Sequence, residues 1–312
     1  MKIIGLDSLL FGVDDLATAV SYFTDYGLNS VQASERGRRF EAMDGTAVEI
    51  RSGADKSIPA AMGPGCKLRQ TVYGVADEKD LERIATELSK DRDVIRTNDG
   101  GVESADDMGF SLRFQKTVRR PFNAPAEVIN SPGVALRRGM NQTAADPNAK
   151  IQPRTLSHIV YFVPDVAKAE AFYVKRLGFM VSDRFLGVGP FLRPAGTSDH
   201  HTLFMIQTPA FMKGVEHFTF HVGGPTELFL AGKRFTERGH KTFWGPGRHV
   251  FGSNWFWYFE SPLNCHVEYD ADMDQHDDQW TPREAPLSAD TSQIFLLQHR
   301  APWAPVGPPH KD

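Results

Sequence analysis

The chain repeats one structural plan in its two halves, yet its histidines occur in only one of them. The segment LDSLLFGVDDL at residues 6–16 aligns with LSHIVYFVPDV at residues 156–166, and each runs into an amphipathic helix pattern. All 11 histidines lie in the second half, and His158 is the first. A scaffold that required imidazoles would keep some of them in both copies. We therefore expect the second half to carry the chemistry and the first half mainly architecture.

The repeat predicts a fold of four similar units. Each unit reads as an apolar strand, a helix and then shorter strands, with helices expected over residues 15–26, 78–91, 166–177 and 226–238. One such unit cannot cover both faces of its sheet, whereas paired units can curl their strands around a shared cavity. We predict an α+β fold in which four tandem βαβββ modules form two domains, each a curled mixed sheet around a cavity.

Composition indicates where the halves divide. Residues 121–153 are rich in proline, alanine and asparagine, which is typical of a linker rather than of a packed element. We expect an N-terminal domain without a metal site over residues 1–120 and a C-terminal catalytic domain over residues 154–285. Residues 286–312 are expected to form an irregular, proline-rich tail.

The charge balance limits the partners. The 312 residues include 35 Lys+Arg and 39 Asp+Glu, and no basic stripe suggests nucleic acid or an anionic membrane as a partner. Cys66 and Cys265 fall in different predicted domains, so a disulfide framework is not expected. No run of about 18 apolar residues occurs, and the opening segment turns charged by Asp7. We expect a soluble cytoplasmic protein.

Three ligand-type residues fall at equivalent points of the strand pattern. His158 lies on the first strand of the third unit, His217 on the first strand of the fourth, and Glu268 on the last strand of the fourth. A single histidine on a strand is more often an ordinary core or surface residue, but three such residues at repeat-equivalent positions favour a metal site. Two imidazoles and one carboxylate would occupy one face of the ion and leave positions open, which suits non-haem Fe(II) and oxygen chemistry.

The first half provides an internal control for this site. By the same alignment, the three positions are Ser8, Gln70 and Glu49. A lone glutamate cannot hold a divalent ion, so we expect no metal site in the first domain.

Further polar motifs follow in the second half, and together with the ligands they carry a family resemblance. They are the paired histidines His200 and His201 of DHHTLFM, His249 of GPGRH and Tyr258 of WYFESP, ahead of the HVEYD glutamate. With the histidines of LSHIV and VEHFTF, the second domain resembles the type I extradiol (meta-cleaving) ring dioxygenases of the vicinal oxygen chelate superfamily. The order of His, Tyr, Pro and Glu within residues 247–269 is the most specific part. The first domain matches in architecture but lacks ligands, as in the family's two-domain members.

The resemblance implies an Fe(II)-dependent dioxygenase that inserts both atoms of O2 into a catecholic ring; Mn(II) is the alternative metal. His201 matches the family's acid/base histidine, while His249 and Tyr258 match positions that hydrogen-bond the substrate oxygens. His200 is expected to be an exposed loop residue. Family members usually assemble as homo-oligomers, so a homo-oligomer is expected here.

An apolar pocket wall is expected beside these groups. An aromatic wall favours a substituted or bicyclic catechol, such as 2,3-dihydroxybiphenyl, over catechol itself. The candidate wall residues are Val160, Phe191 and Phe204 together with Phe185, Phe243, Trp244 and Phe256. The other histidines are interpreted as structural or as neighbours of the ligands (His221 and His266) or as surface residues (His240, His276, His299 and His310).

Two other functions stay open from the residues alone. One is a glyoxalase-like isomerase, lyase or hydrolase that uses Ni, Zn or Mn as a Lewis acid and does not need His201, His249 and Tyr258. The other is a metal-free protein that binds an aromatic ligand, for which ligand positions should be degenerate in both halves. The three polar residues and the complete ligand set of the second half favour the dioxygenase.

Overall fold

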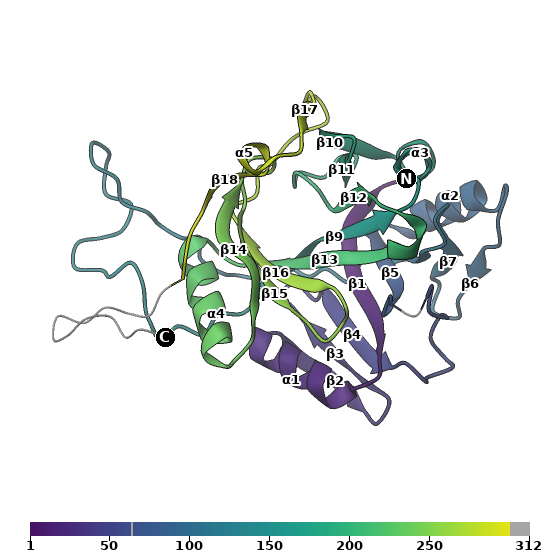
Figure 1. Ribbon diagram of the computed structural model, residues 1–312, viewed down its shortest axis with the longest axis horizontal. Coiled ribbons are helices and arrows are strands. Elements are labelled where there is room, and N and C mark those ends of the chain that lie inside the picture. Colours follow the sequence, from purple (N-terminus) through teal and green to yellow (C-terminus); the bar gives the residue numbers. More distant parts are fainter. Residues whose placement is uncertain (64, 300–312) are drawn as a thin grey trace.

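Two curled sheets dominate the computed structural model, which describes residues 1–63 and 65–299 (Figure 1). The first sheet has the strand order β2-β3-β4-β1-β5-β8-β7-β6. Its strands are β1 (Ile3–Val13), β2 (Asn29–Ser34), β3 (Gly37–Glu41), β4 (Ala47–Ser52), β5 (Leu68–Val75), β6 (Ile95–Arg96), β7 (Val102–Ala105) and β8 (Ser111–Lys116).

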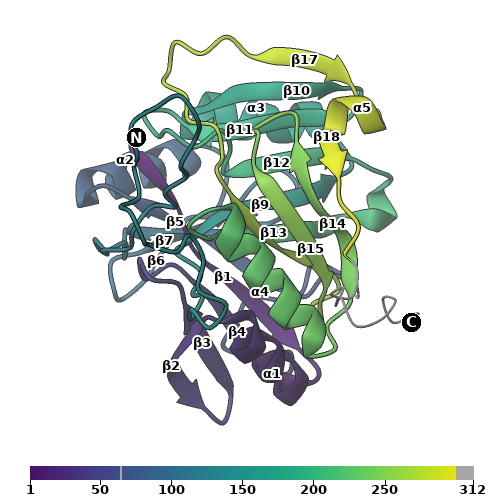
Figure 2. The same cartoon turned by 90° about the vertical axis from the view of Figure 1, so that its left-hand side faces the viewer.

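The second sheet has the order β17-β10-β11-β12-β9-β13-β16-β15-β14-β18, which can be followed from β17 and β10 to β13 in Figure 2. Its strands are β9 (Thr155–Val163), β10 (Phe179–Leu186), β11 (Gly189–Pro194), β12 (Leu203–Gln207), β13 (Gly214–His221), β14 (Thr242–His249), β15 (Trp255–Glu260), β16 (His266–Ala271), β17 (Arg283–Pro286) and β18 (Gln293–Leu296).

Strand pairing repeats four times. In every unit the last strand runs parallel to the first, as β1 with β4, β5 with β8, β9 with β12 and β13 with β16. The two units of a sheet are joined by antiparallel first strands, β1 with β5 and β9 with β13. The predicted α+β fold of four βαβββ modules in two curled sheets is therefore confirmed.

Helix termini repeat as well. Asp15 and Asp165 precede equivalent helices, and each carboxylate accepts a hydrogen bond from a backbone N–H of the first turn. Gly27 and Gly178 follow the same two helices with φ of 95° and 74°, a conformation that glycine adopts without steric cost. None of the described helices is long and apolar enough to cross a membrane. The helices are α1 (Leu16–Tyr26), α2 (Glu78–Leu88), α3 (Val166–Leu177), α4 (Pro225–Glu237), α5 (Ala289–Ser292) and the 3-10 turn η1 (Ala210–Met212).

The two sheets share one hydrophobic core. Phe11 of β1 lies 5.3 Å from Phe218 of β13, measured between ring centroids. Tyr26, the last residue of α1, stacks on Tyr269 of β16 at 4.0 Å, and its hydroxyl donates a 2.6 Å hydrogen bond to the main-chain oxygen of Glu268. The first half thus braces the strand that carries Glu268.

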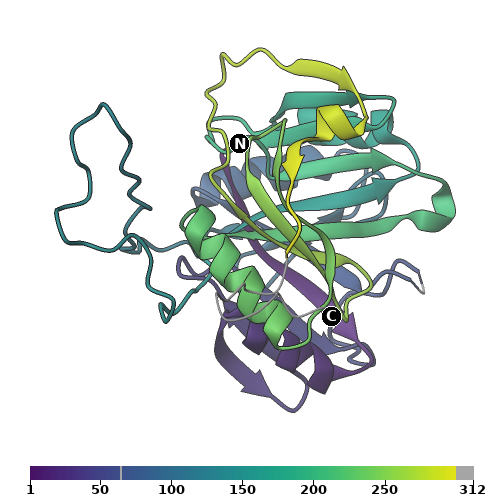
Figure 3. The ribbon, with the colours of Figure 1, turned by 60° about the vertical axis from the view of Figure 1, so that its left-hand side comes forward.

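The segment between the two sheets and the segment after β16 differ in secondary structure. No helix or strand occurs between β8 and β9 in the described chain, and this segment projects from the body as an arm (Figure 3). The expectation of an irregular tail is wrong for the part before residue 297: β17 pairs with β10, α5 follows, and β18 pairs with β14. A capping box between Ser288 and Thr291 starts α5. The proline-rich segment 302–309 lies outside the described residues, and the domain boundaries stay predictions.

Candidate metal centre

Three adjacent strands bring the predicted ligands together. His158 of β9, His217 of β13 and Glu268 of β16 are buried, and their ligand atoms all lie within 4.8 Å of one another. No other group of three His, Cys, Asp or Glu that could hold a metal ion occurs within residues 1–63 and 65–299. The two Nε2 atoms are 3.3 Å apart, and Oε2 of Glu268 lies 3.4 Å from Nε2 of His158 and 3.5 Å from that of His217. The geometric condition for a shared ion is met.

Hydrogen bonds occupy the outer side of this group, and Thr219 lies on its inner side, where its hydroxyl donates to Oε2 of Glu268 and lies 3.0 Å from Nε2 of His158. The Glu216 carboxylate accepts a hydrogen bond from Nδ1 of His217, and Ser157 Oγ lies 2.9 Å from Nδ1 of His158. A proton on Nδ1 leaves the Nε2 lone pair available to a metal. Oε1 of Glu268 is buried and has no hydrogen-bond partner among the described residues. Two imidazole lone pairs beside a carboxylate that keeps one oxygen without a partner fit a divalent cation.

The charges of two of the three groups suit metal binding. Burial would lower the pKa of His217, but Glu216 and Glu268 outweigh burial and raise the pKa, so this imidazole must lose its extra proton to bind an ion. Burial would raise the pKa of Glu268, but hydrogen bonds to His158 and His249 and nearby positive charge outweigh it, so the pKa lies well below its usual range. Burial lowers the pKa of His158. An ionised carboxylate beside a neutral imidazole is the protonation state that a metal requires of its ligands.

Glu216 is a second acidic group at the centre that the sequence did not indicate. Burial would raise its pKa, but His217 and His266 lower it to about 2. His266 Nδ1 lies 2.8 Å from Oε1 of Glu216, and the aromatic ring of Phe243 stacks on His266 at 3.6 Å. Strand alternation would turn Glu216 away from His217, but a register shift between Val215 and His217 breaks the alternation and brings Glu216 to the cavity.

The control positions of the first half need one correction. Ser8 and Gln70 line the cavity of the first sheet as expected. Glu49, however, lies on β4, the counterpart of β12. It pairs with Leu10 of β1 as Phe204 pairs with Val160 of β9, so Glu49 is the equivalent of Phe204. The counterpart of β16 is β8, where Arg113 takes the place of Glu268. Every unit ends in a strand parallel to its first strand. The sequence alignment matched Glu268 to a residue of β4, which ends the first unit, instead of a residue of β8, which ends the second.

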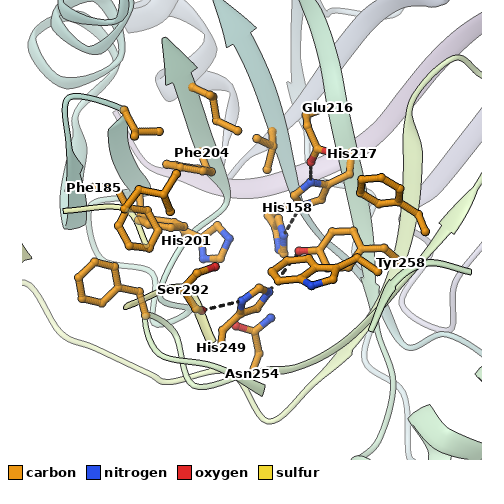
Figure 4. Close-up of a pocket in the computed structure, with 18 residues that line it drawn as sticks. His158, Phe185, His201, Phe204, Glu216, His217, His249, Asn254, Tyr258 and Ser292 are labelled. Carbon is orange, nitrogen blue, oxygen red and sulfur yellow. Dashed lines mark hydrogen bonds and ion pairs between the residues drawn. The ribbon is translucent and has the colours of Figure 1, made fainter. Parts of the chain in front are cut away.

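The three predicted polar residues line the same cavity as His158 and His217 (Figure 4). The ring of His201 lies 4.1 Å from that of His158, and Nε2 of His249 lies 3.2 Å from the hydroxyl oxygen of Tyr258. Burial, with the nearby Glu268 charge, raises the pKa of Tyr258 well above its usual value. Tyr258 therefore keeps its proton and can donate it in a hydrogen bond.

The expectation that His200 is an exposed loop residue is wrong. Its side chain is 0% exposed, with Nδ1 3.0 Å from Nδ1 of His201 and Nε2 2.8 Å from Asp183. Asp274 and His276, which contact it, come from more than 70 residues later in the chain, so local sequence could not indicate the burial.

The remaining histidines divide between the centre and the periphery. Two of them lie near the centre. His221 of β13 is 2.6 Å from Asp270 of β16, and His266 of β16 lies beside Glu216 of β13. His299 is exposed as expected, whereas His240 and His276 are half-buried because their rings stack on Phe235 and Trp280. His310 lies outside the described residues.

The cavity has a volume of about 230 Å³ and a largely aromatic wall. Phe191 and Phe204 stack in parallel at 4.0 Å and form one side of it. Phe256 does not line the cavity; it lies behind Trp244 and His249, at 4.4 and 4.1 Å. The other predicted wall residues line it, namely Val160, Phe185, Phe191, Phe204, Phe243 and Trp244, and lining residues not predicted are Val188, Ile206, Glu216, Phe251, Asn254, Leu287 and Ser292.

A family model agrees with this arrangement. Residues 155–269, which contain all three candidate ligands, match the model described as the Glyoxalase/Bleomycin resistance protein/Dioxygenase superfamily. This part of the chain is a domain of that superfamily. The predicted resemblance is thereby confirmed at the level of the superfamily.

Curated relatives carry the names of extradiol catechol dioxygenases. Metapyrocatechase 2 of Cupriavidus necator is 34% identical over 154 residues, which span 48% of this chain and 45% of the relative, so the match covers less than half of that protein. Biphenyl-2,3-diol 1,2-dioxygenase of Paraburkholderia xenovorans is 27% identical over 276 residues, or 86% of this chain and 88% of the relative.

Solved structures share the fold over almost the whole chain. The Mn(II)-bound glyoxalase from Novosphingobium aromaticivorans has a TM-score of 0.73 at 20% identity, over 94% of this chain and 91% of that one. The 2,2',3-trihydroxybiphenyl 1,2-dioxygenase from Sphingomonas wittichii has a TM-score of 0.71 at 18% identity, over 95% and 99%. Because proteins named for two chemistries share this fold, the side chains of the site must decide between them.

Proposed function

We propose that this protein is an extradiol catechol dioxygenase that uses Fe(II). The observation that carries the proposal is that His158 and His217, which lie together with Glu268, line one aromatic cavity with three further polar side chains. The names of the curated relatives support the same activity. In the proposed reaction, the ring C–C bond next to the two hydroxyls and the O–O bond break. Both oxygen atoms enter the ring-opened product, so the ring carbons are oxidised and O2 is reduced without another electron donor.

Iron(II) held by the three ligands would bind the catechol oxygens and O2 and pass electron density between them. The protein's own part begins with His249 and Tyr258, which lie on neighbouring strands 3.2 Å apart at their polar atoms. Tyr258 donates its hydroxyl hydrogen to one catechol oxygen, and this stabilises the negative charge that forms there when the catechol loses a proton.

His201 occupies a different part of the cavity, beside His158 and against Phe191. An imidazole here can take up a proton at one atom and return it at another stage of the reaction. The aromatic wall excludes water, which strengthens these interactions and protects the reacting groups from side reactions.

The shape of the wall supports a substituted or bicyclic catechol as the substrate. The stacked pair Phe191 and Phe204, with Phe185 and Phe251, forms an apolar group of buried rings that meets the polar side chains where Phe191 contacts His201. An apolar substituent on the catechol ring would gain free energy by leaving water for this surface.

The proposal is tested with protein that is loaded anaerobically with Fe(II) and mixed with 2,3-dihydroxybiphenyl, alkylcatechols and catechol. We expect oxygen uptake together with a yellow ring-opened product. His217→Ala should lose the iron, whereas His201→Phe should keep iron and catechol but turn over far more slowly. Gln70→Ala, at the position of the first sheet equivalent to His217, is the matched control and should behave as the wild type. No oxygen uptake by fully iron-loaded wild type with any catechol would refute the proposal.

A glyoxalase-like lyase or isomerase is the second candidate, because Glu216 places another carboxylate at the centre. The Glu216 carboxylate accepts a hydrogen bond from Nδ1 of His217, whereas the candidate ligand atom of that ring is Nε2. Glu216 thus lies on the outer side of the imidazole, and this position argues against Glu216 as a fourth ligand. The same protein loaded with Mn(II) or Ni(II) and assayed without oxygen distinguishes the two chemistries. Assembly as a homo-oligomer and a cytoplasmic location stay predictions; light scattering of the purified protein measures the first.

A further inference from the structure

A buried chain of polar groups runs from the back of the cavity to the segment around β17. It consists of His201, His200, Asp183 and Arg283, in that order of contact. His201 Nδ1 lies 3.0 Å from His200 Nδ1, and His200 Nε2 lies 2.8 Å from Asp183 Oδ2. His200 and Asp183 are both 0% exposed and His201 is 4% exposed, so water does not compete for these contacts.

Asp183 is held as an ionised acceptor. Arg283 donates to Oδ2 from Nη2 at 2.6 Å, and its backbone N–H donates to Oδ1 at 2.7 Å. Burial would raise the pKa of Asp183, but the hydrogen bonds from His200 and Arg283 outweigh it and lower the pKa. Asp183 and Arg283 are register partners on the parallel strands β10 and β17.

The ionised carboxylate determines where the protons of the two imidazoles lie. A carboxylate only accepts, so Nε2 of His200 carries a proton. Burial lowers the pKa of His200 despite Asp183, which favours the neutral imidazole, and in the neutral ring Nδ1 is then an acceptor. Nδ1 of His201 therefore donates to it, and Nε2 of His201 keeps its lone pair.

We propose that His200 and Asp183 are positioning residues that hold His201 as the tautomer with an unprotonated Nε2 in the cavity. His201 then enters the reaction as a base, able to take up a proton before it acts as an acid. The role assigned to His201 rests on the proposed function, whereas its tautomer and orientation do not. In a Ser-His-Asp triad a buried carboxylate fixes the tautomer of the catalytic imidazole by bonding it directly; in this chain His200 lies between the two.

A purely structural role for the chain, as an anchor for β17, makes different predictions. An anchor would affect stability in proportion to the bonds lost and would not alter the protonation of His201. Asp183→Asn separates the two roles. The single amide oxygen would take the place of Oδ1, where the backbone N–H and Nε of Arg283 donate, and the bond from Nη2 of Arg283 would be lost. The amide nitrogen would then face His200, which would have to accept at Nε2 and donate at Nδ1. His201 would be driven to the opposite tautomer.

The first measurement is the tautomer of His201 by nitrogen NMR in metal-free protein labelled with 15N-histidine. We expect a proton on Nδ1 in the wild type and on Nε2 in Asp183→Asn. Glu170→Gln is the matched control. It weakens the 2.7 Å ion pair between Glu170 and Arg184, the residue that follows Asp183 on β10, and this pair does not contact His200. The control should keep the wild-type tautomer. An unprotonated Nδ1 in the wild type, or the same tautomer in Asp183→Asn, would overturn the proposal.

The second measurement is steady-state kinetics on iron-loaded enzyme. His200→Phe keeps a ring but removes both hydrogen bonds, and we expect kcat to fall by about 10- to 100-fold. The KM for the catechol should change by no more than a few-fold, because His249 and Tyr258 are intact. His200→Asn, whose amide oxygen can replace the acceptor at Nδ1, should recover part of kcat. Equal kcat in His200→Phe and Glu170→Gln would overturn the proposal, as would a loss confined to iron content or KM. If wild type takes up no oxygen, the proposed function fails, and the NMR measurement still decides the tautomer.

Discussion

The hydroxyl of Tyr26 offers a direct test of how the first half supports the metal centre. It donates a 2.6 Å hydrogen bond to the main-chain oxygen of Glu268 in a fully buried setting. Tyr26→Phe removes this bond and preserves the ring that stacks on Tyr269. A buried acceptor that loses its donor costs about 1–3 kcal/mol. We therefore expect the free energy of unfolding to fall by about 1–3 kcal/mol and metal affinity to fall with it, because Glu268 loses a restraint.

Tyr22 provides the matched control on the same helix. It is buried in the same aromatic cluster, but its hydroxyl has no hydrogen-bond partner among the described residues. Tyr22→Phe removes a polar group that is already unsatisfied, so the free energy of unfolding should stay unchanged or rise by up to about 1 kcal/mol.

The assay is urea unfolding of both variants without metal, followed by competition with a chelator for the bound ion. The comparison with Tyr22→Phe removes the general effect of losing a buried hydroxyl. If Tyr26→Phe is no less stable than Tyr22→Phe, the hydrogen bond to Glu268 does not brace the ligand strand and the reasoning is wrong.

Three further outcomes are expected. Glu216→Gln should weaken metal binding by about 10- to 100-fold in chelator competition, because the carboxylate orients His217; an unchanged Kd would contradict this. Phe204→Ala should raise kcat/KM for bulky alkylcatechols relative to catechol by roughly tenfold, and an unchanged ratio would remove Phe204 from the specificity wall. Burial raises the pKa of Asp106 to about 6 from an ordinary 3.8, so the folded state favours its protonated form. Stability from this group is complete below pH 3.8 and is lost as the pH rises through about 6, by up to about 3 kcal/mol. Asp106→Asn should flatten this dependence in unfolding experiments between pH 4 and 7.

The sequence predicted the features that depend on repetition and on strand alternation. Repeated openings at residues 6–16 and 156–166 indicated the four modules, and equivalent strand positions indicated His158, His217 and Glu268. The modules were confirmed and the three side chains do lie together, because the period of a strand is regular and a duplicated fold keeps its register; their role as ligands stays a prediction.

The features that were missed depend on departures from that regularity or on contacts between distant segments. Glu216 reaches the centre because of a bulge, and a bulge cannot be read from alternation. His200 contacts Asp274 and His276, more than 70 residues later, so its neighbours in sequence give no sign of its burial. The error over Glu49 has a similar origin, because strand pairing decides which residue faces the ligands.

The arginine of the first sheet has a consequence for the duplicated half. Arg113 stands where Glu268, the candidate metal-binding carboxylate, stands in the other copy, and it pairs with Asp99 at 2.5 Å and Glu103 at 3.1 Å. The same ligand set in the first sheet would take three changes, at Ser8, Gln70 and Arg113, and replacement of the arginine alone would leave two acidic side chains without their counter-charge. The two copies of the duplicated fold therefore differ by three residues in their capacity to hold a cation.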